Sequence, residues 1–314
     1  MTDLYQVLRD RLMAGLDVLP DKPEENADST LRALWYAAAG APRSAAAATD
    51  GDLPTLDPGT QVQALEQLIT RRLAGEPLAY ITGYQRFMGL EMLSSQHALI
   101  PRAETEQLAR ACIALLQEPT VRRNARVIDV CTGSGNLAFA IADQIPDAHV
   151  VGTDLSLDAI DLAKRNAVSL GMQGKVSFRT GDLLAPFETA EFIGNTDLIV
   201  SNPPYITSTK LNQTDLIACA PSHISSKVER MAAEIAAHEP RLAFDGGPFG
   251  ISILMRLIED APHLLCGGGW LAFEVGLGQG HALTKRLESN PAWQQVRPLA
   301  DANSATRVIL AQRV

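Results

Sequence analysis

The architecture follows from one segment, Val127-Ile128-Asp129-Val130-Cys131-Thr132-Gly133-Ser134-Gly135-Asn136. Its first residues form a short, mostly apolar run typical of a buried strand, and a helical pattern begins at Leu137 after a glycine-containing turn. Gly133 and Gly135 allow the backbone to turn sharply and to approach a bulky ligand where a Cβ would collide. Many α/β units use glycine merely to turn, so this segment predicts an α/β unit and leaves the ligand open.

Strand and helix patterns alternate from Arg126 onward. The apolar runs are 127–130, 149–153, 176–178, 198–200, 270–275 and 307–310. This alternation predicts the α/β fold class with a doubly wound, mostly parallel sheet. Two final runs, around Val296 and Arg307, are joined without room for a helix, so we expect an antiparallel C-terminal edge hairpin.

Helical patterns dominate the N-terminal part of the chain. Two lie between Leu4 and Gly40, and we expect Asp28-Ser29 to cap the second. The segment 42–60 is rich in Ala, Pro, Asp and Gly and has no apolar period, which predicts a connector. A third helix places apolar residues from Val62 to Leu73 on one face.

A change of pattern near residue 79 marks a boundary. Short runs of aromatic and β-favouring residues, broken by Gly83 and Gly89, predict a β-hairpin linker over 79–100. We therefore expect a helical domain at 1–78 and an α/β domain at 101–314.

Bulk composition restricts the class of protein. The chain has 314 residues, of which 46% are hydrophobic and 20% charged, and its formal net charge is −9. No apolar stretch approaches the roughly 18 residues of a membrane span, and the N-terminus lacks a secretion signal, so we expect a cytoplasmic protein. Cys and His spacings predict no metal site, and the acidic charge without a basic cluster argues against nucleic-acid binding.

Polar residues at later strand ends predict a cofactor. Asp154 closes the second run of the sheet and can accept hydrogen bonds from both ribose hydroxyls, which fits a nicotinamide cofactor as well as S-adenosylmethionine. Ala138 stands where a dinucleotide motif has its third glycine, and Asp182 after the third run could accept from an adenine amino group. The predicted cofactor contacts are Asp129, Thr132, Gly133, Ser134, Gly135, Asp154, Leu155, Gly181, Asp182, Leu183 and Asn202. Asp129 has two candidate roles, support of the glycine turn or electrostatic contact with a sulfonium.

The fourth run leads directly into Ser201-Asn202-Pro203-Pro204-Tyr205. Two prolines fix φ and cannot pair in a ladder, so the loop is stiff. The Asn202 side-chain oxygen and the Pro203 carbonyl can accept hydrogen bonds from both N–H groups of a planar NH2 group. Tyr205 can stack on the planar group. Stiffness suits methyl transfer, because the nitrogen must lie behind the methyl group within near-attack distance. These residues predict an S-adenosyl-L-methionine-dependent N-methyltransferase that releases S-adenosyl-L-homocysteine.

The chain resembles the protein-(glutamine-N5) methyltransferase family, which modifies the glutamine of the Gly-Gly-Gln motif in peptide-chain release factors and, in a sister group, a ribosomal protein. The matching blocks, besides Asn202 to Tyr205, are 77–83, 87–90, 99–106, 239–243, 246–247, 273–276 and 279–280. The resemblance implies a class I, Rossmann-like methyltransferase domain. It also implies that Thr105 and Glu106 lie near the substrate; alternatively, Glu104 and Glu106 complement the N-terminal dipole of their own helix.

Three departures from the family pattern bear on the acceptor. Ala103 stands where proline is usual, the segment 206–238 is longer than expected and has a helical pattern over 222–237, and the N-terminal region is longer. These departures favour an alternative in which the acceptor is a small molecule with an amide or guanidinium nitrogen. Two further alternatives are adenine-N6 methylation of nucleic acid and a non-catalytic cofactor-binding module.

Overall fold

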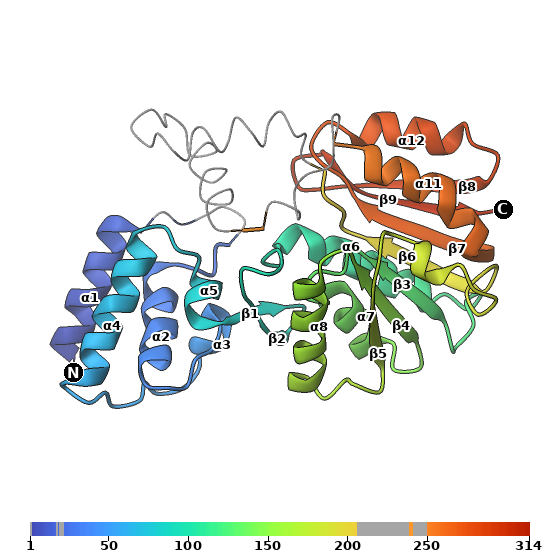
Figure 1. The fold of residues 1–314 in the computed structure, drawn as a ribbon. Coiled ribbons are helices and arrows are strands. Elements are labelled where there is room, and N and C mark those ends of the chain that lie inside the picture. Colours follow the sequence, from blue (N-terminus) through green and yellow to red (C-terminus); the bar gives the residue numbers. More distant parts are fainter. Residues whose placement is uncertain (1, 17, 19–21, 206–238, 241–249) are drawn as a thin grey trace. The chain divides into compact units, whose positions relative to one another are not determined.

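The computed structural model describes residues 2–16, 18, 22–205, 239–240 and 250–314 (Figure 1). The helical pattern predicted over 222–237 lies outside these residues. The described residues form two compact units, one containing the N-terminal helices with a two-stranded hairpin and the other containing a seven-stranded sheet.

Among the described residues, the helices of the first unit are α1 (Thr2–Gly15), α2 (Ala27–Ala38), α3 (Ala45–Ala48), α4 (Thr60–Leu73) and α5 (Leu78–Thr82). Leu34 of α2 and Leu65 of α4 are fully buried in a common core. The expected cap at Asp28-Ser29 was wrong: Asn26 caps α2, and its side chain accepts from the two backbone N–H groups of those residues. Asparagine, aspartate and serine cap equally well, so composition alone does not choose among them.

The predicted connector contains one helical turn, α3, which the sequence analysis missed. Ser44 caps it by accepting a hydrogen bond from the Ala47 N–H at 3.2 Å, and Glu91 of the hairpin in turn accepts from the Ser44 hydroxyl at 2.7 Å. Four residues are too few to show an apolar period, which is why the pattern did not reveal the turn.

The hairpin predicted over 79–100 is confirmed for residues 84–93, whereas residues 79–82 of that range belong to helix α5. Strands β1 (Tyr84–Phe87) and β2 (Leu90–Leu93) pair antiparallel, with Phe87 opposite Leu90. Met88 and Gly89 both have positive φ, 50° and 86°, which is the backbone of a two-residue turn that matches strand twist.

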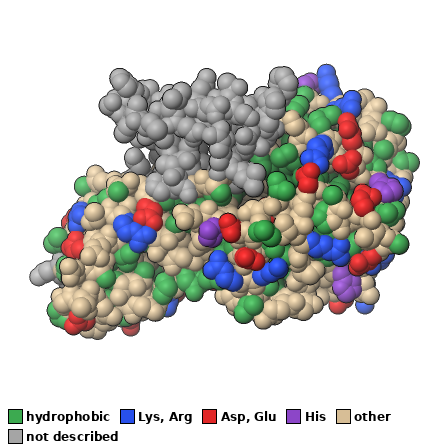
Figure 2. Space-filling model, in the orientation of Figure 1, with side chains coloured by type: hydrophobic (Ala, Val, Ile, Leu, Met, Phe, Trp, Pro, Cys, Tyr) green, Lys and Arg blue, Asp and Glu red, His purple; other side chains and the backbone are tan. Residues whose placement is uncertain are grey.

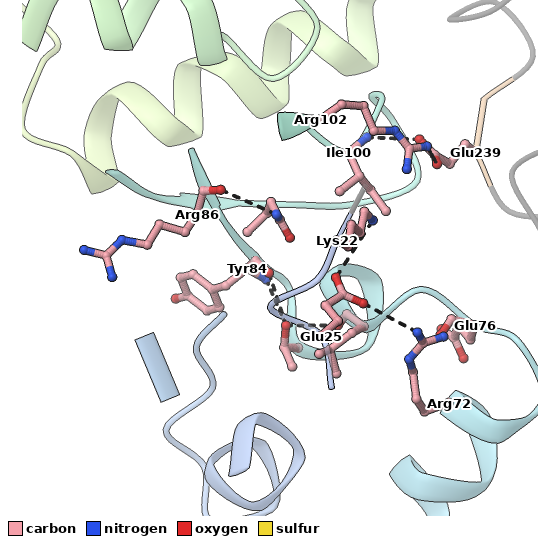
Figure 3. Close-up of polar contacts among 12 residues, drawn as sticks. Lys22, Glu25, Arg72, Glu76, Tyr84, Arg86, Ile100, Arg102 and Glu239 are labelled. Atoms are coloured by element: carbon pink, nitrogen blue, oxygen red, sulfur yellow. Dashed lines mark hydrogen bonds and ion pairs between the residues drawn. The ribbon is translucent and has the colours of Figure 1, made fainter. Parts of the chain in front are cut away.

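Buried charges lie in the first unit (Figure 3). Glu25 is 3.9 Å from Lys22 and 3.5 Å from Arg72, and all three side chains are buried. Glu239 forms an ion pair with Arg102 and accepts from the Ile100 N–H at 3.1 Å. Two blocks of the family pattern, 99–106 and 239–243, therefore meet through this carboxylate.

The second unit is the α/β domain. Its strands are β3 (Arg126–Val130), β4 (His149–Asp154), β5 (Val176–Thr180), β6 (Thr196–Ser201), β7 (Leu265–Glu274), β8 (Trp293–Ala300) and β9 (Thr306–Arg313). Its helices are α6 (Ala103–Leu116), α7 (Asn136–Gln144), α8 (Leu157–Ser169), the single turn η1 (Ala185–Phe187), α11 (Ser252–Leu264) and α12 (Gly280–Glu288). The strand order is β5-β4-β3-β6-β7-β9-β8.

The sheet confirms the predicted fold class. Strands β3 to β7 are mutually parallel, whereas β9 is antiparallel to both β7 and β8. Helices α7 and α8 pack against β3, β4 and β5, and α11 and α12 pack against β7, β8 and β9 (Figure 1). Coverage of this kind explains why the central strands are continuous apolar runs.

The strand order reverses between β3 and β6. The chain runs outward from β3 through β4 to β5 on one side, and it then returns to β6 on the other. Loops at such a switch point diverge and leave a crevice at the carboxyl ends of the strands. The predicted cofactor and acceptor segments both follow strands at this crevice. In the described part of the chain, no helix has the length and apolarity to cross a membrane.

Candidate active site

The glycine turn after β3 has a backbone that side chains seldom adopt. Cys131, Gly133 and Gly135 have φ of 59°, 55° and 88°. A Cβ on Gly135 would lie 2.5 Å from the Phe139 ring, so this position requires glycine for space as well as for φ. Helix α7 begins directly after it, so its first N–H groups face the crevice end of the sheet.

Asp129 supports this turn. It is fully buried, and its Oδ2 accepts from the Thr132 hydroxyl at 2.6 Å and from the Ala138 N–H at 3.1 Å. Its Oδ1 has no partner among the described residues. Burial raises the pKa of Asp129 to about 7. Asp129 thus supports the glycine turn, which is the first of its two predicted roles. Its contact with a sulfonium stays a prediction.

Asp154 ends β4 with both oxygens oriented by backbone groups. Its Oδ2 accepts from the Gly133 N–H at 2.9 Å, and its Oδ1 accepts from the Ser156 N–H at 2.9 Å. Burial raises the pKa of this carboxyl even though these N–H groups oppose the shift. Leu155, the next residue, exposes 59% of its surface, which is unusual for leucine and leaves an apolar side chain beside the carboxylate.

The end of β5 lies beside Asp154, because the Gly181 N–H donates to the Asp154 carbonyl at 3.0 Å. Asp182 is exposed and forms two hydrogen bonds with Arg256 of α11, at 3.1 and 2.8 Å. Leu183 is buried in the hydrophobic core. The three strand ends therefore meet as predicted, but Asp182 has a guanidinium partner that the sequence analysis did not foresee.

Asn202 is held by a hydrogen bond from its amide. Its Nδ2 donates to the Thr105 hydroxyl oxygen at 3.1 Å, and that hydroxyl donates to Glu274 Oε2 at 2.8 Å. Thr105 and Glu274 are both 1% exposed. Ser201 anchors the start of the loop by donating from its hydroxyl to the Val130 carbonyl at 2.8 Å. Within the described residues, neither the Asn202 Oδ1 nor the carbonyl of the buried Pro203 accepts a hydrogen bond.

Tyr205 meets the same carboxylate. Its hydroxyl donates to Glu274 Oε1 at 3.1 Å, and the Arg307 guanidinium lies 3.6 Å from that oxygen. Burial raises the pKa of Glu274, with Thr105 and Arg307 opposing the shift. Burial, and next the Glu274 charge, raise the pKa of Tyr205 above its ordinary value, so its hydroxyl stays protonated.

Gln279 fixes the far end of the loop. Its Nε2 donates to the carbonyls of Tyr205 and Gly250 at 3.0 and 3.1 Å, and its Oε1 accepts from the Gly276 N–H at 2.9 Å. A Cβ on Gly250 would lie 2.3 Å from the Tyr205 carbonyl oxygen. The loop between Ser201 and Tyr205 is therefore held at both ends.

The two predicted α6 residues differ in placement. Thr105 contacts Asn202 directly, whereas Glu106 accepts from Arg110 at 2.6 Å on its own helix. No role was predicted for Glu274 or Arg307 from the sequence. The sequence could have indicated Glu274, because it is an acidic residue at the end of an otherwise apolar buried strand. A buried charge needs a partner.

Comparisons with known proteins identify the family. The methyltransferase small domain model matches residues 104–232, and the PrmC N-terminal domain model matches residues 12–83. The release factor glutamine methyltransferase of Bradyrhizobium diazoefficiens is 34% identical over 254 residues, which cover 81% of this chain and 78% of that protein. The chain belongs to the release factor glutamine methyltransferase family.

A second relative of this family, from Geobacter sulfurreducens, is 37% identical over 71% of this chain and 69% of its own length. The resemblance seen in the sequence is thus confirmed, and it is a methyltransferase family that uses S-adenosylmethionine. Among solved structures, the catalytic domain of human Mettl16 in complex with a 3′UTR hairpin has a TM-score of 0.51 at 15% identity over 83% of each chain. At that identity it shows the shared fold alone.

Proposed function

We propose that this chain transfers a methyl group from S-adenosylmethionine to the side-chain amide nitrogen of a glutamine, in the Gly-Gly-Gln motif of a peptide-chain release factor. The observation that carries the proposal is the fixed amide of Asn202. Its Nδ2 is engaged by Thr105, so its Oδ1 is left to accept from an incoming NH2 group. Membership of the family supports glutamine as the bearer of that group.

The residues at the strand ends fit the cofactor. The buried Asp129 Oδ1 lacks a partner among the described residues, and Gly133 and Gly135 leave the turn without Cβ atoms. Asp154 would accept from the ribose hydroxyls, because each of its oxygens keeps a lone pair beyond its backbone bond. The exposed Leu155 would cover the adenine, and Asp182 would accept from its amino group.

The residues of the acceptor loop bind and orient the nitrogen that receives the methyl group. When bound, S-adenosylmethionine would supply the methyl group, on a sulfonium whose neutral thioether is a good leaving group. Asn202 Oδ1 and the Pro203 carbonyl oxygen accept hydrogen bonds from the two N–H groups of the acceptor amide. They thereby stabilise the positive charge that develops on its nitrogen. The proton leaves the methylated nitrogen for water, and no side-chain base is required.

We propose that the helical domain recognises the protein substrate, with boundaries at 1–78 for this domain, 79–100 for the hairpin linker and 101–314 for the methyltransferase domain. Residues 12–83 match the N-terminal domain of the family, which supports a separate role for the helical domain. Figure 2 shows acidic and basic side chains interspersed over the described residues of one face, without an extended basic stripe there. A protein substrate suits such a surface better than a phosphate backbone does.

The test is incubation of the protein with purified release factor and methyl-labelled S-adenosylmethionine, followed by peptide mass mapping. We expect one methyl group on the Gly-Gly-Gln peptide and none on a release factor whose glutamine is replaced by alanine. Label on a different residue, or on a small molecule present in a cell extract but never on the release factor, would refute the proposed acceptor.

A further inference from the structure

Glu274 connects three parts of the chain at the acceptor loop. Its Oε2 accepts from Thr105 of α6, its Oε1 accepts from Tyr205 after β6, and Arg307 of β9 lies beside Oε1. The carboxylate is 1% exposed. Burial raises the pKa of this carboxyl, whereas the two O–H donors and the guanidinium oppose that shift and favour the ionised form.

Ionised Glu274 fixes the direction of each hydrogen bond that leads to Asn202. A carboxylate only accepts, so the single proton of the Thr105 hydroxyl is directed to Glu274. Thr105 can then only accept from Asn202, and the amide must turn its Nδ2 toward Thr105. The assignment of oxygen and nitrogen in an asparagine amide follows from such a network.

We infer that Glu274 is a positioning residue that sets the donor–acceptor polarity of the site, by holding the Asn202 oxygen toward the acceptor through Thr105. This inference rests on the proposed function. The opposite amide orientation would present N–H donors to an incoming NH2 group and exclude it. Glu274 therefore selects acceptors that donate hydrogen bonds, although it lies one side chain away from them.

The Tyr205 ring is oriented by the same residue. Its hydroxyl proton points to Glu274, so the ring that would stack on the acceptor amide is fixed at its far end. Both elements of the acceptor loop thus depend on one buried charge, and Arg307 keeps that charge in place at 3.6 Å.

Three variants distinguish the effect of hydrogen-bond direction from the effect of side-chain size. Thr105→Val keeps the shape but removes the hydroxyl, whereas Thr105→Ser retains it. Glu274→Gln keeps the shape but introduces a donor, so the Thr105 proton is free to turn to Asn202 and the amide can flip. Thr30→Val is the matched control, because Thr30 is equally buried, in α2, and its hydroxyl has no partner among the described residues.

Turnover is the first measurement. We expect Thr105→Val and Glu274→Gln to lower kcat for release-factor methylation by roughly 10- to 100-fold, as misplacement of a reacting group does. The calorimetric Kd for S-adenosylmethionine should change less than about threefold, because only the acceptor loop is affected. Thr105→Ser should recover most of the kcat that Thr105→Val loses, and Thr30→Val should keep kcat near the wild-type value. Wild-type kcat in Glu274→Gln would overturn the inference.

The second measurement does not depend on the acceptor. In protein labelled with ¹⁵N-asparagine, the Asn202 signals are identified by their loss in Asn202→Ala. We expect one deshielded Nδ2 proton in the wild type and in Thr105→Ser, and its loss in Glu274→Gln, a residue that does not contact Asn202. Persistence of that proton in Glu274→Gln would also overturn the inference. If the wild type does not methylate release factor but the proton behaves as expected, the proposed function fails and the polarity of the site stands.

Discussion

The Gly133 N–H donates a hydrogen bond to Asp154 Oδ2 at 2.9 Å, so the glycine turn after β3 and the carboxylate that ends β4 form a single structure. The Ser156 N–H orients the other oxygen at 2.9 Å. Rotation of the carboxylate is thereby restricted before any ligand arrives. Preorganisation of this kind lowers the entropy cost of binding.

Asp154→Asn should weaken cofactor binding. The amide has a single oxygen and cannot accept from two ribose hydroxyls, and a hydrogen bond to a charged group contributes about 1.5–3 kcal/mol. We expect the calorimetric Kd for S-adenosylmethionine to rise roughly 10- to 100-fold, with a smaller change in kcat at saturation. Asp158→Asn, the same change on the exposed surface of α8, is the control. Equal affinities in the wild type and Asp154→Asn would show that the ribose lies elsewhere.

Asp129→Asn should change how stability depends on pH. The native pKa of Asp129 is about 7, above the value of 3.8 for an exposed group, so between these pH values the native state binds more protons than the unfolded state. The wild type therefore loses stability as pH rises through this window, by on the order of 4 kcal/mol at most, since one pKa unit is about 1.4 kcal/mol.

Asparagine mimics the protonated carboxyl and does not titrate, because its oxygen can serve Thr132 and Ala138 while its NH2 replaces the unpartnered Oδ1. The free energy of unfolding in urea, measured at several pH values without cofactor, should favour Asp129→Asn increasingly from pH 4 to pH 7. A difference between the two proteins that is independent of pH would argue against a raised pKa.

The sheet was predictable because each strand has a local signal, a short apolar run bounded by turn residues. Strand β7 shows the limit, because it begins at Leu265 whereas the prediction began at Trp270. Its residues 267–269 are glycines, which carry no side chain and so give no apolar pattern.

The site was predictable only where its residues follow strands directly. Asp154 and Asn202 were predicted in this way, because parallel strands end at one edge of the sheet. The pairing of Thr105 with Glu274 joins residues that are 169 positions apart, and the Asp182–Arg256 pair joins residues 74 positions apart. Such contacts depend on the tertiary packing of helices on the sheet, which no local pattern encodes.

Gly250→Ala should damage the acceptor loop. Gly250 has φ of 66°, and an added Cβ would lie 2.3 Å from the Tyr205 carbonyl oxygen, so the loop must move. We expect kcat to fall roughly 10- to 100-fold, as small misplacements do. Gly171→Ala is the matched control, because its φ is 67° with no atom within 4 Å of an added Cβ. It should lose about 1 kcal/mol of stability from the backbone alone and keep full kcat. Equal kcat in the two variants would mean that Gly250 does not position the loop.

Glu25→Gln should destabilise the protein. Glu25 lies between the buried cations of Lys22 and Arg72, at 3.9 and 3.5 Å, and removal of its charge takes a buried carboxylate partner from both (Figure 3). We expect a loss of about 3–5 kcal/mol in the free energy of unfolding of the helical unit, measured by urea titration. Glu66→Gln, which breaks the exposed pair with Arg11, should cost less than about 1 kcal/mol. A comparable loss in both variants would show that burial of the Glu25 pair is unimportant.

The most direct test of the account is a comparison of Asn202→Ala with the wild type in single-turnover methylation of release factor, together with the calorimetric Kd for S-adenosylmethionine. We expect a rate lower by roughly 10²- to 10³-fold, as for loss of one group that stabilises transition-state charge, and a nearly unchanged Kd. Equal losses in rate and in cofactor affinity would contradict it, because Asn202 would then hold the cofactor and not the methyl acceptor.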